Sequence, residues 1–368
     1  MDAAVRGKPM TTKPKLVVGA NGFLGSHVTR RLVEGGAEVR AMVREGADTR
    51  SIDDLDVTRF YGDVFDSATL RQAMTGCDDI YYCVVDTRAW LRDPAPLFRT
   101  NVEGLRNVLD VLVDPGAGES IAAGLRKFVF TSSYATVGRR RGHIATEDDR
   151  IRRRGLTPYV QSRVQAEDLV LAYAAEKDLP AVAMCVSTTY GGGDWGRTPH
   201  GAFIAGAVFG KLPFSMRGIG VEAVGVVDAA DALILAAERG RAGERYLISE
   251  RMISIDEVIR IAADEAGVPP PRRSISVPTL YALGALGSMK AWLTRTDAEL
   301  SVTSVRMMRA EAEVHHGKAV RELGWRPQPV QKAIRQAARF WMKLRAADSG
   351  TQSGHDDQKR AVRDVWKL

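Results

Sequence analysis

The stretch KLVVGANGFLG, residues 15–25, begins with a short apolar run and then turns through Gly19, Gly22 and Gly25. The residues that follow repeat apolar side chains at helical spacing as far as the pair Gly35 and Gly36. A strand, a glycine turn and a helix in this order suit a pyrophosphate. Glycine lets the backbone approach the anion closely, and the helix start offers free N–H groups. The stretch therefore predicts a nucleotide-binding βα unit.

The rest of the first half continues the same rhythm. Further apolar, β-rich runs lie at 38–44, 58–62, 78–85, 127–133 and 181–187, and helical patterns lie at 67–74, 97–112 and 159–177. Strands that alternate with helices indicate βαβ units and a parallel sheet that is buried on both faces. We therefore expect an α/β protein with a Rossmann-type, doubly wound parallel sheet and a smaller, mostly helical C-terminal substrate region.

The pattern also divides the chain. Residues 1–13 predict a flexible extension, and residues 14–187 predict the NAD(P)-binding domain, to which a βα unit at about 221–250 returns. We assign residues 188–220 and 251–345 to substrate binding, with helices expected around the prolines at 269–271 and 278. The polar residues 346–368 predict a mobile tail.

Composition excludes several classes of protein. The chain has 52 basic and 45 acidic side chains, a net charge of +7, three cysteines and six histidines. The cysteines and histidines show neither a disulfide pattern nor metal-ligand spacing, so we expect no metal. Arginines crowd into 139–154 without interleaved aromatic residues, which favours a solvated loop and not a nucleic-acid site.

No segment predicts a membrane span or a secretory signal. The longest uncharged run, 274–289, is shorter than the roughly 20 residues that cross a bilayer. The first residues lack an apolar core of the kind that signal peptides carry. We therefore expect a cytoplasmic protein.

The end of the second predicted strand indicates the preferred cofactor. NAD-binding proteins usually place an acidic residue there, to accept a hydrogen bond from the ribose 2′-hydroxyl. This chain has Arg44 instead, and a guanidinium pairs with a 2′-phosphate. We expect NADP(H), with NAD(H) as the alternative.

Several motifs in order resemble the extended short-chain dehydrogenase/reductases of the NAD-dependent epimerase/dehydratase superfamily. The resemblance is to the dihydroflavonol-reductase-like and 3β-hydroxysteroid-dehydrogenase-like branch, and it covers about residues 15–345. Its motifs are VGANGFLG at 18–25, GDV at 62–64, NVEG at 101–104, FVFTSS at 128–133 and YVQSR at 159–163. Later landmarks are 191–199, 227–228 and 321–327.

The resemblance implies a role for each motif. Ser133 would polarise a carbonyl, Tyr159 would donate the proton, and Arg163 stands where the family has a lysine that holds the nicotinamide ribose. The implied cofactor-binding residues are Gly19, Asn21, Gly22, Phe23, Leu24, Arg44, Asp63, Val64, Cys83, Val84, Tyr159 and Arg163. A cation one helical turn after Tyr159 favours the phenolate, but a guanidinium does not relay protons as an ammonium does.

Apolar side chains after the sixth predicted strand favour a hydrophobic substrate over a nucleotide sugar, whose phosphates need several cations. The candidate substrate residues are Trp90, Tyr134, Tyr190, Trp195 and Phe203. The leading hypothesis is an NADP-dependent reductase of a hydrophobic ketone or aldehyde, or the reverse alcohol oxidation, by a monomer or homodimer. One alternative is an NAD-dependent sugar-nucleotide epimerase or dehydratase. A second is an NADPH-binding protein whose catalysis is weakened or lost because of Arg163.

Overall fold

The computed structural model describes residues 13–116, 119–138, 140, 142–298, 300–309 and 313–350. Within them the main sheet has seven strands in the order β10-β6-β5-β4-β1-β2-β3, and every pairing in it is parallel. The strands are β1 (Lys15–Val18), β2 (Val39–Val43), β3 (Thr58–Tyr61), β4 (Asp79–Tyr82), β5 (Lys127–Ser133), β6 (Ala181–Val186) and β10 (Arg245–Ile248). The predicted doubly wound sheet is confirmed.

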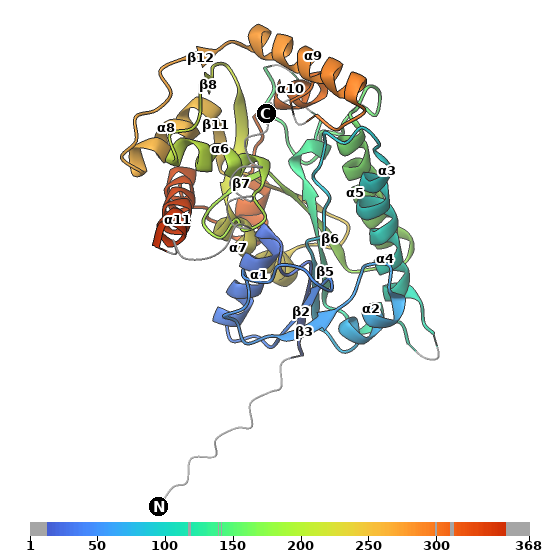
Figure 1. Cartoon of the computed structure of the whole chain (residues 1–368). Helices are drawn as coiled ribbons and strands as arrows, with labels where there is room; N and C mark the ends of the chain where they lie inside the picture. Colours follow the sequence, from blue (N-terminus) through green and yellow to red (C-terminus); the bar gives the residue numbers. More distant parts are fainter. Residues whose placement is uncertain are drawn as a thin grey trace, which may run out of the picture.

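Helices cover both faces of this sheet (Figure 1). One face carries α1 (Phe23–Glu34) and α7 (Val226–Arg239). The other carries α2 (Ser67–Met74), α4 (Leu105–Val113) and α5 (Pro158–Glu176). Val17 points into the first core, whereas Leu16 and Val18 point into the second, because successive strand residues face opposite sides.

The order in which strands are added to the sheet reverses between β1 and β4, although all the strands stay parallel. It winds outward through β2 and β3, then returns to the other side of β1 to form β4 and β5. In open α/β sheets the carboxyl ends of the strands at such a reversal form the crevice that binds ligands. The predicted glycine turn after β1 lies at this crevice.

Residues after β6 form a second layer, interrupted by α7 and β10, which belong to the main sheet and its helices. Its three-stranded sheet has the order β11-β9-β7, and a two-stranded sheet pairs β12 with β8. The strands are β7 (Thr188–Tyr190), β8 (Ser215–Met216), β9 (Gly220–Gly225), β11 (Arg251–Ser254) and β12 (Ser274–Ile275). Helices α6 (Pro199–Val208), α8 (Ile255–Glu265) and α11 (Val330–Gly350) pack here around a third core. Helices α9 (Val277–Thr294) and α10 (Val302–Arg309) pack against each other beside it.

Three details differ from the sequence-based expectations. The predicted helix at 97–112 is divided into α3 (Ala95–Phe98), a π-helical turn (Arg99–Gly104) and α4. The segment after 250 starts with β11 and not with a helix, since Arg251–Ser254 pairs antiparallel with β9. Residues 346–350, expected in a mobile tail, continue α11. The remainder of that tail, 351–368, and residues 1–12 lie outside the described residues.

No helix in the described part of the chain is both long and apolar enough to cross a membrane.

Candidate active site

The glycine turn has no room for side chains. Gly19 adopts a φ of +82°, and a Cβ there would lie 2.9 Å from Cγ2 of Val84. A Cβ on Gly25 would lie 2.1 Å from the Gly19 carbonyl oxygen. Glycine is therefore required at both positions, the first by conformation and the second by the close passage of the backbone.

The turn delivers the chain into α1 with its first N–H groups available to a ligand. Gly22 is the residue that caps the helix, so no side chain bonds to its first turn, and that turn holds no acidic residue. Unpaired N–H groups and the helix dipole together favour an anion at this point. Phe23 and Leu24, predicted to bind the cofactor, supply the first two of these groups.

Asn21 has a structural task that the sequence motif does not reveal. Its side-chain amide donates to the Asp48 carbonyl over 3.1 Å, and its own carbonyl accepts from the Ser51 hydroxyl over 3.1 Å. These bonds tie the glycine turn to the loop after β2. Arg44 is exposed at the start of that loop, and no acidic residue takes its place at the strand end.

The segments after β3 and β4 border the same crevice. One oxygen of the exposed Asp63 accepts the Phe65 N–H over 3.1 Å, and the neighbouring Val64 is buried. Cys83 is bonded through its N–H to Val18, and burial raises the pKa of its thiol to about 11, so it stays protonated at neutral pH. The side chain of Val84 lies next to Gly19, because its Cγ2 occupies the space that a Cβ on Gly19 would need. This segment therefore packs against the glycine turn.

Ser133 ends β5, and Tyr159 is the second residue of α5. The Ser133 hydroxyl oxygen accepts the Ala135 N–H over 3.2 Å, which leaves its hydrogen available to donate. Thr157 caps the start of α5, since its hydroxyl accepts the Val160 N–H. Tyr159 is half-buried.

Arg163 is buried one turn along α5, with 1% of its surface exposed. Its Nη2 donates to the Thr131 carbonyl over 2.5 Å, and its Cζ lies 5.2 Å from the Phe130 ring centre. Its Nε and Nη1 are buried and have no hydrogen-bond partner among the residues that the structure describes. Unpaired buried donors are costly, and a cofactor's ribose hydroxyls are the acceptors such a site needs. The glycine cradle and these two donors together fit a dinucleotide.

Asn101 is a buried clamp between strand and helix. Its amide nitrogen donates to the Asp86 carbonyl and to the Ser162 hydroxyl, both over 3.0 Å, and its oxygen accepts the Asp86 N–H over 2.8 Å. Ser162 lies between Tyr159 and Arg163, so Asn101 joins the segment after β4 to α5. The NVEG motif marked this residue, but no role was predicted for it.

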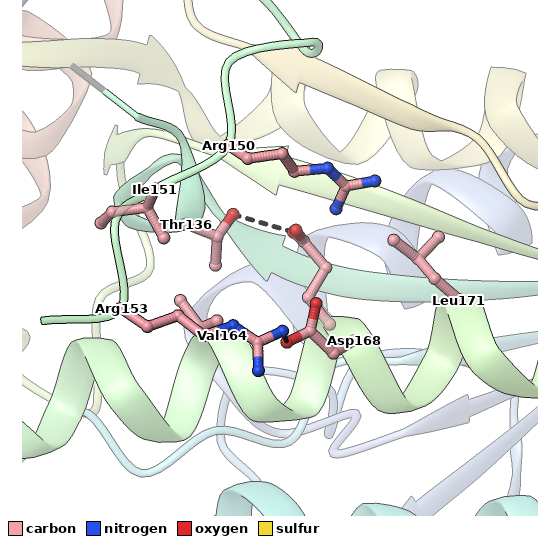
Figure 2. Close-up of a pocket in the computed structure, with 8 residues that line it drawn as sticks. Thr136, Arg150, Ile151, Arg153, Val164, Asp168 and Leu171 are labelled. Carbon is pink, nitrogen blue, oxygen red and sulfur yellow. Dashed lines mark hydrogen bonds and ion pairs between the residues drawn. The ribbon is translucent and has the colours of Figure 1, made fainter. Parts of the chain in front are cut away.

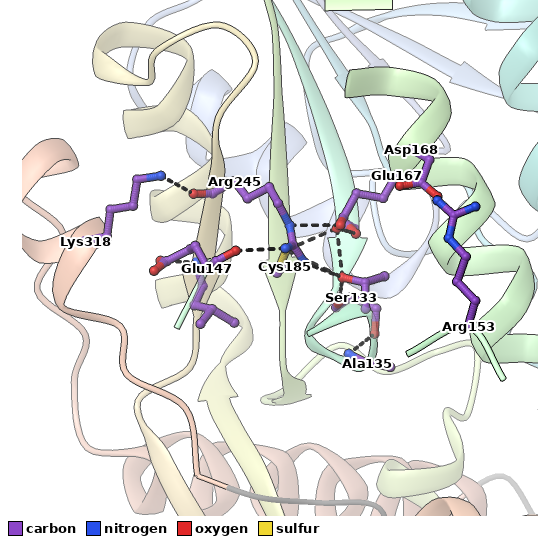
Figure 3. Close-up of polar contacts among 12 residues, drawn as sticks. Ser133, Ala135, Glu147, Arg153, Glu167, Asp168, Cys185, Arg245 and Lys318 are labelled. Carbon is purple, nitrogen blue, oxygen red and sulfur yellow. Dashed lines mark hydrogen bonds and ion pairs between the residues drawn. The ribbon is translucent and has the colours of Figure 1, made fainter. Parts of the chain in front are cut away.

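A polar cluster lies behind Ser133 (Figure 3). Glu167, one turn after Arg163, accepts hydrogen bonds from Ser132 over 2.5 Å and from Thr136 over 2.9 Å. Its other oxygen lies 2.9 Å from Nε of Arg245. These contacts hold the residues on both sides of Ser133, and sequence reasoning missed them because Arg245 comes from a distant strand.

The arginine-rich loop contributes to this cluster, which corrects its prediction as a purely solvated segment. Glu147 is 8% exposed; its carbonyl accepts from Arg245 over 2.9 Å and its carboxylate accepts the Leu247 N–H over 2.8 Å. Arg150 and Arg153 do face solvent. The loop is therefore anchored through Glu147, while Arg150 and Arg153 are exposed.

A cavity of about 340 Å³ lies between this loop and α5 (Figure 2). Arg153 and Asp168 form an ion pair of 2.6 Å at its side. The lining residues are Thr136, Arg150, Ile151, Arg153, Val164, Glu167, Asp168 and Leu171. Ser133, Tyr159 and Arg163 are not among them, whereas Thr136 and Glu167 are, so this cavity adjoins the polar cluster.

The five predicted substrate residues are dispersed. Tyr134 directly follows β5, and Trp90 lies in the loop between β4 and α3. Tyr190 is 2% exposed in the third core, against which Phe203 also packs. Trp195 packs on Phe340 and under the guanidinium of Arg50, 4.6 Å away, so it faces the loop after β2.

Comparison with known proteins agrees with this arrangement. The sequence profile described as "NAD dependent epimerase/dehydratase family" matches residues 15–249. Sterol demethylase protein B of Methylococcus capsulatus is 27% identical over 91% of this chain and 99% of its own length. Dihydroflavonol 4-reductase of Zea mays is 27% identical over 68% of this chain and 73% of its own length. The crystal structure of gox2253 is similar with a TM-score of 0.78 at 30% identity, over 90% of this chain and 99% of that chain.

The resemblance predicted from the motifs is confirmed, and an NAD(P)-dependent enzyme is the class that these relatives share with the observed fold. The chain belongs to the NAD-dependent epimerase/dehydratase family, within the extended short-chain dehydrogenase/reductases.

Proposed function

We propose that the chain is an NADP-dependent reductase of a ketone or aldehyde on a hydrophobic small molecule, or the corresponding alcohol dehydrogenase. The observation that carries the proposal is Arg163, a buried cation with two unpaired donors, one helical turn after Tyr159. Relatives named for dihydroflavonol reduction and sterol demethylation support a hydrophobic substrate.

The chemistry divides among three side chains. The bound dinucleotide supplies the hydride. Ser133 donates a hydrogen bond to the carbonyl oxygen, where negative charge develops, and Tyr159 gives that oxygen its proton. Arg163 holds a ribose hydroxyl with its free donors, and its permanent charge stabilises the phenolate that Tyr159 becomes.

Arg44 supports NADP(H) over NAD(H). It is exposed at the end of β2, where a carboxylate would repel the 2′-phosphate and a guanidinium binds it. Titration of nicotinamide fluorescence should show NADPH binding at least about ten-fold more tightly than NADH, a difference of about 1.4 kcal/mol. Equal affinities contradict this preference.

A screen of hydrophobic ketones and alcohols with both cofactors, followed by absorbance of the reduced nicotinamide, tests the reaction. Tyr159→Phe should lower kcat by about 10²–10⁴-fold on any accepted substrate, because the proton donor is lost. Its affinity for NADPH should stay within two-fold of the parent (about 0.4 kcal/mol). Full turnover in this variant excludes Tyr159 as the donor.

Arg163→Lys separates the reductase from a cofactor-binding protein with lost catalysis. If the site is fitted to the guanidinium, the shorter ammonium leaves the Thr131 carbonyl without its donor, and kcat should fall by at least about ten-fold. A rise in kcat instead indicates a site weakened by arginine. Lys177→Arg, a change at the exposed end of the same helix, is the control.

A further inference from the structure

Helix α9 packs on the rest of the protein through glycines and exposes large apolar side chains to solvent. Its inner side carries Gly284 and Gly287, where a Cβ would lie 3.0 Å from Ser301 and 2.0 Å from the Leu300 carbonyl. A helix that faces water normally buries its large apolar residues and exposes polar ones. Here the backbone of α9 instead packs closely on the segment before α10.

The large apolar residues of α9 point outward. The exposed fractions are 73% for Trp292, 66% for Leu293, 57% for Leu286 and 55% for Met289. Residues 286, 289 and 293 recur at the spacing of one helix face, and Trp292 borders it. These four residues form what we call the outer face of α9, and Figure 1 shows this helix at the periphery of the molecule.

Basic residues lie on α9 and at both of its ends. Lys290 is the one charged residue within α9, and Arg295 follows the helix. Arg272 and Arg273, both exposed, precede it. The nearby acidic Asp297 accepts the N–H of Arg92 over 2.8 Å, which also places this end of α9 beside the loop after β4. An apolar helix face with basic borders is complementary to anionic lipid headgroups above acyl chains.

We propose that the outer face of α9 is a docking surface for an anionic lipid bilayer. Trp292 would lie at the boundary between headgroups and acyl chains, which tryptophan favours, and Lys290 would extend to the phosphates. A second copy of the chain fits less well, because one convex helix face offers roughly a few hundred Å², below the about 800 Å² per partner of a stable dimer. Docking of this kind needs no membrane-spanning helix and goes beyond the proposed reaction.

Vesicle binding tests the proposal. The purified full chain should co-sediment with vesicles of phosphatidylcholine and phosphatidylglycerol, and at least ten-fold less with phosphatidylcholine alone. The double variant Trp292→Glu/Leu293→Glu should weaken binding to the anionic vesicles at least ten-fold, whereas Ile144→Glu, a change at another exposed apolar residue, should alter it less than two-fold. Lys290→Gln should weaken binding mainly at low salt.

Fluorescence provides a readout that does not depend on a folded double variant. Brominated acyl chains in the anionic vesicles should quench part of the tryptophan emission, and Trp292→Phe, which keeps the face apolar, should lose that quenched part while still binding. Failure of the parent protein to bind anionic vesicles overturns the proposal, as does equal binding by the double variant. A lipid-free dimer that the double variant dissociates identifies a second copy as the occupant and also overturns it.

Discussion

The glycine turn after β1 and the polar cluster around Glu167 both lie at carboxyl ends of strands in one sheet. In the turn, backbone atoms decide the geometry, and a Cβ added to Gly25 would lie 2.1 Å from the Gly19 carbonyl oxygen. In the cluster, side chains decide it, and Thr136 and Arg245 meet from positions 109 residues apart. We therefore expect the turn to be sensitive to an added side-chain atom at Gly19 or Gly25, and the cluster to be sensitive to the loss of a charged or hydrogen-bonding side chain.

The largest expected effect is in the turn. Gly25→Val places a Cβ 2.1 Å from the Gly19 oxygen, so the turn must open and the N–H groups of α1 move away from the anion. NADPH affinity should fall at least about 100-fold, or about 2.7 kcal/mol, in a fluorescence titration. Gly124→Ala, where an added Cβ meets no atom within 4 Å, should leave affinity unchanged. Parent-like affinity in Gly25→Val contradicts a pyrophosphate at this turn.

Two neighbouring acids on α5 test the cluster. Glu167→Gln leaves the buried guanidinium of Arg245 without its charge partner and should cost about 3–5 kcal/mol in urea unfolding. Asp168→Asn breaks an exposed ion pair with Arg153 and should cost under about 1 kcal/mol. Similar losses in both variants would mean that burial does not distinguish the two pairs. A parallel fall of kcat in Glu167→Gln is expected, because Glu167 accepts hydrogen bonds from Ser132, next to Ser133, and from Thr136, three residues after it.

His200 in the second layer extends the comparison to a partly exposed residue whose Nδ1 atom is buried and whose ring is kept neutral. Burial lowers the pKa of His200 to about 4, below the 6.5 of the unfolded chain. Below pH 6.5 the unfolded chain binds a proton that the folded protein excludes, so stability is complete above pH 6.5 and falls as pH approaches 4, by about 3 kcal/mol in total. Unfolding of His200→Phe measured between pH 8 and 4 should lack this part of the slope. If the free energy of unfolding of His200→Phe depends on pH as that of the parent does, His200 is not the source of this dependence.

The smallest expected effect is at the exposed Arg44. Arg44→Ser should weaken NADPH binding about ten-fold, or about 1.4 kcal/mol, because a solvated guanidinium gains little from one phosphate. NADH binding should change less than two-fold, and so should NADPH binding in Arg154→Ser, a change at an exposed arginine of the loop. Equal loss for both cofactors would show that Arg44 does not read the 2′-phosphate.

The sequence predicted the main sheet well because its signals are local. Each strand of that sheet is a short apolar run, and α2 begins and ends at the predicted residues Ser67 and Met74. The hydrophobic pattern did not predict β11, because its residues Arg251–Ser254 form a strand only by pairing with β9. It also missed the π-helical turn, in which Asn101 is placed to join β4 and α5.

The sequence alone determined the glycine turn, the order of strands and helices and the spacing of Tyr159 and Arg163, because each depends on neighbours along the chain. Tertiary structure decided which side chains lie together: Glu167 with Arg245, Trp195 with Arg50, and Tyr190 with the apolar side chains of the third core. The physical reason is that a buried charge or ring is stabilised by whatever atoms surround it in space, and those atoms come from segments whose separation along the chain leaves no periodic signal.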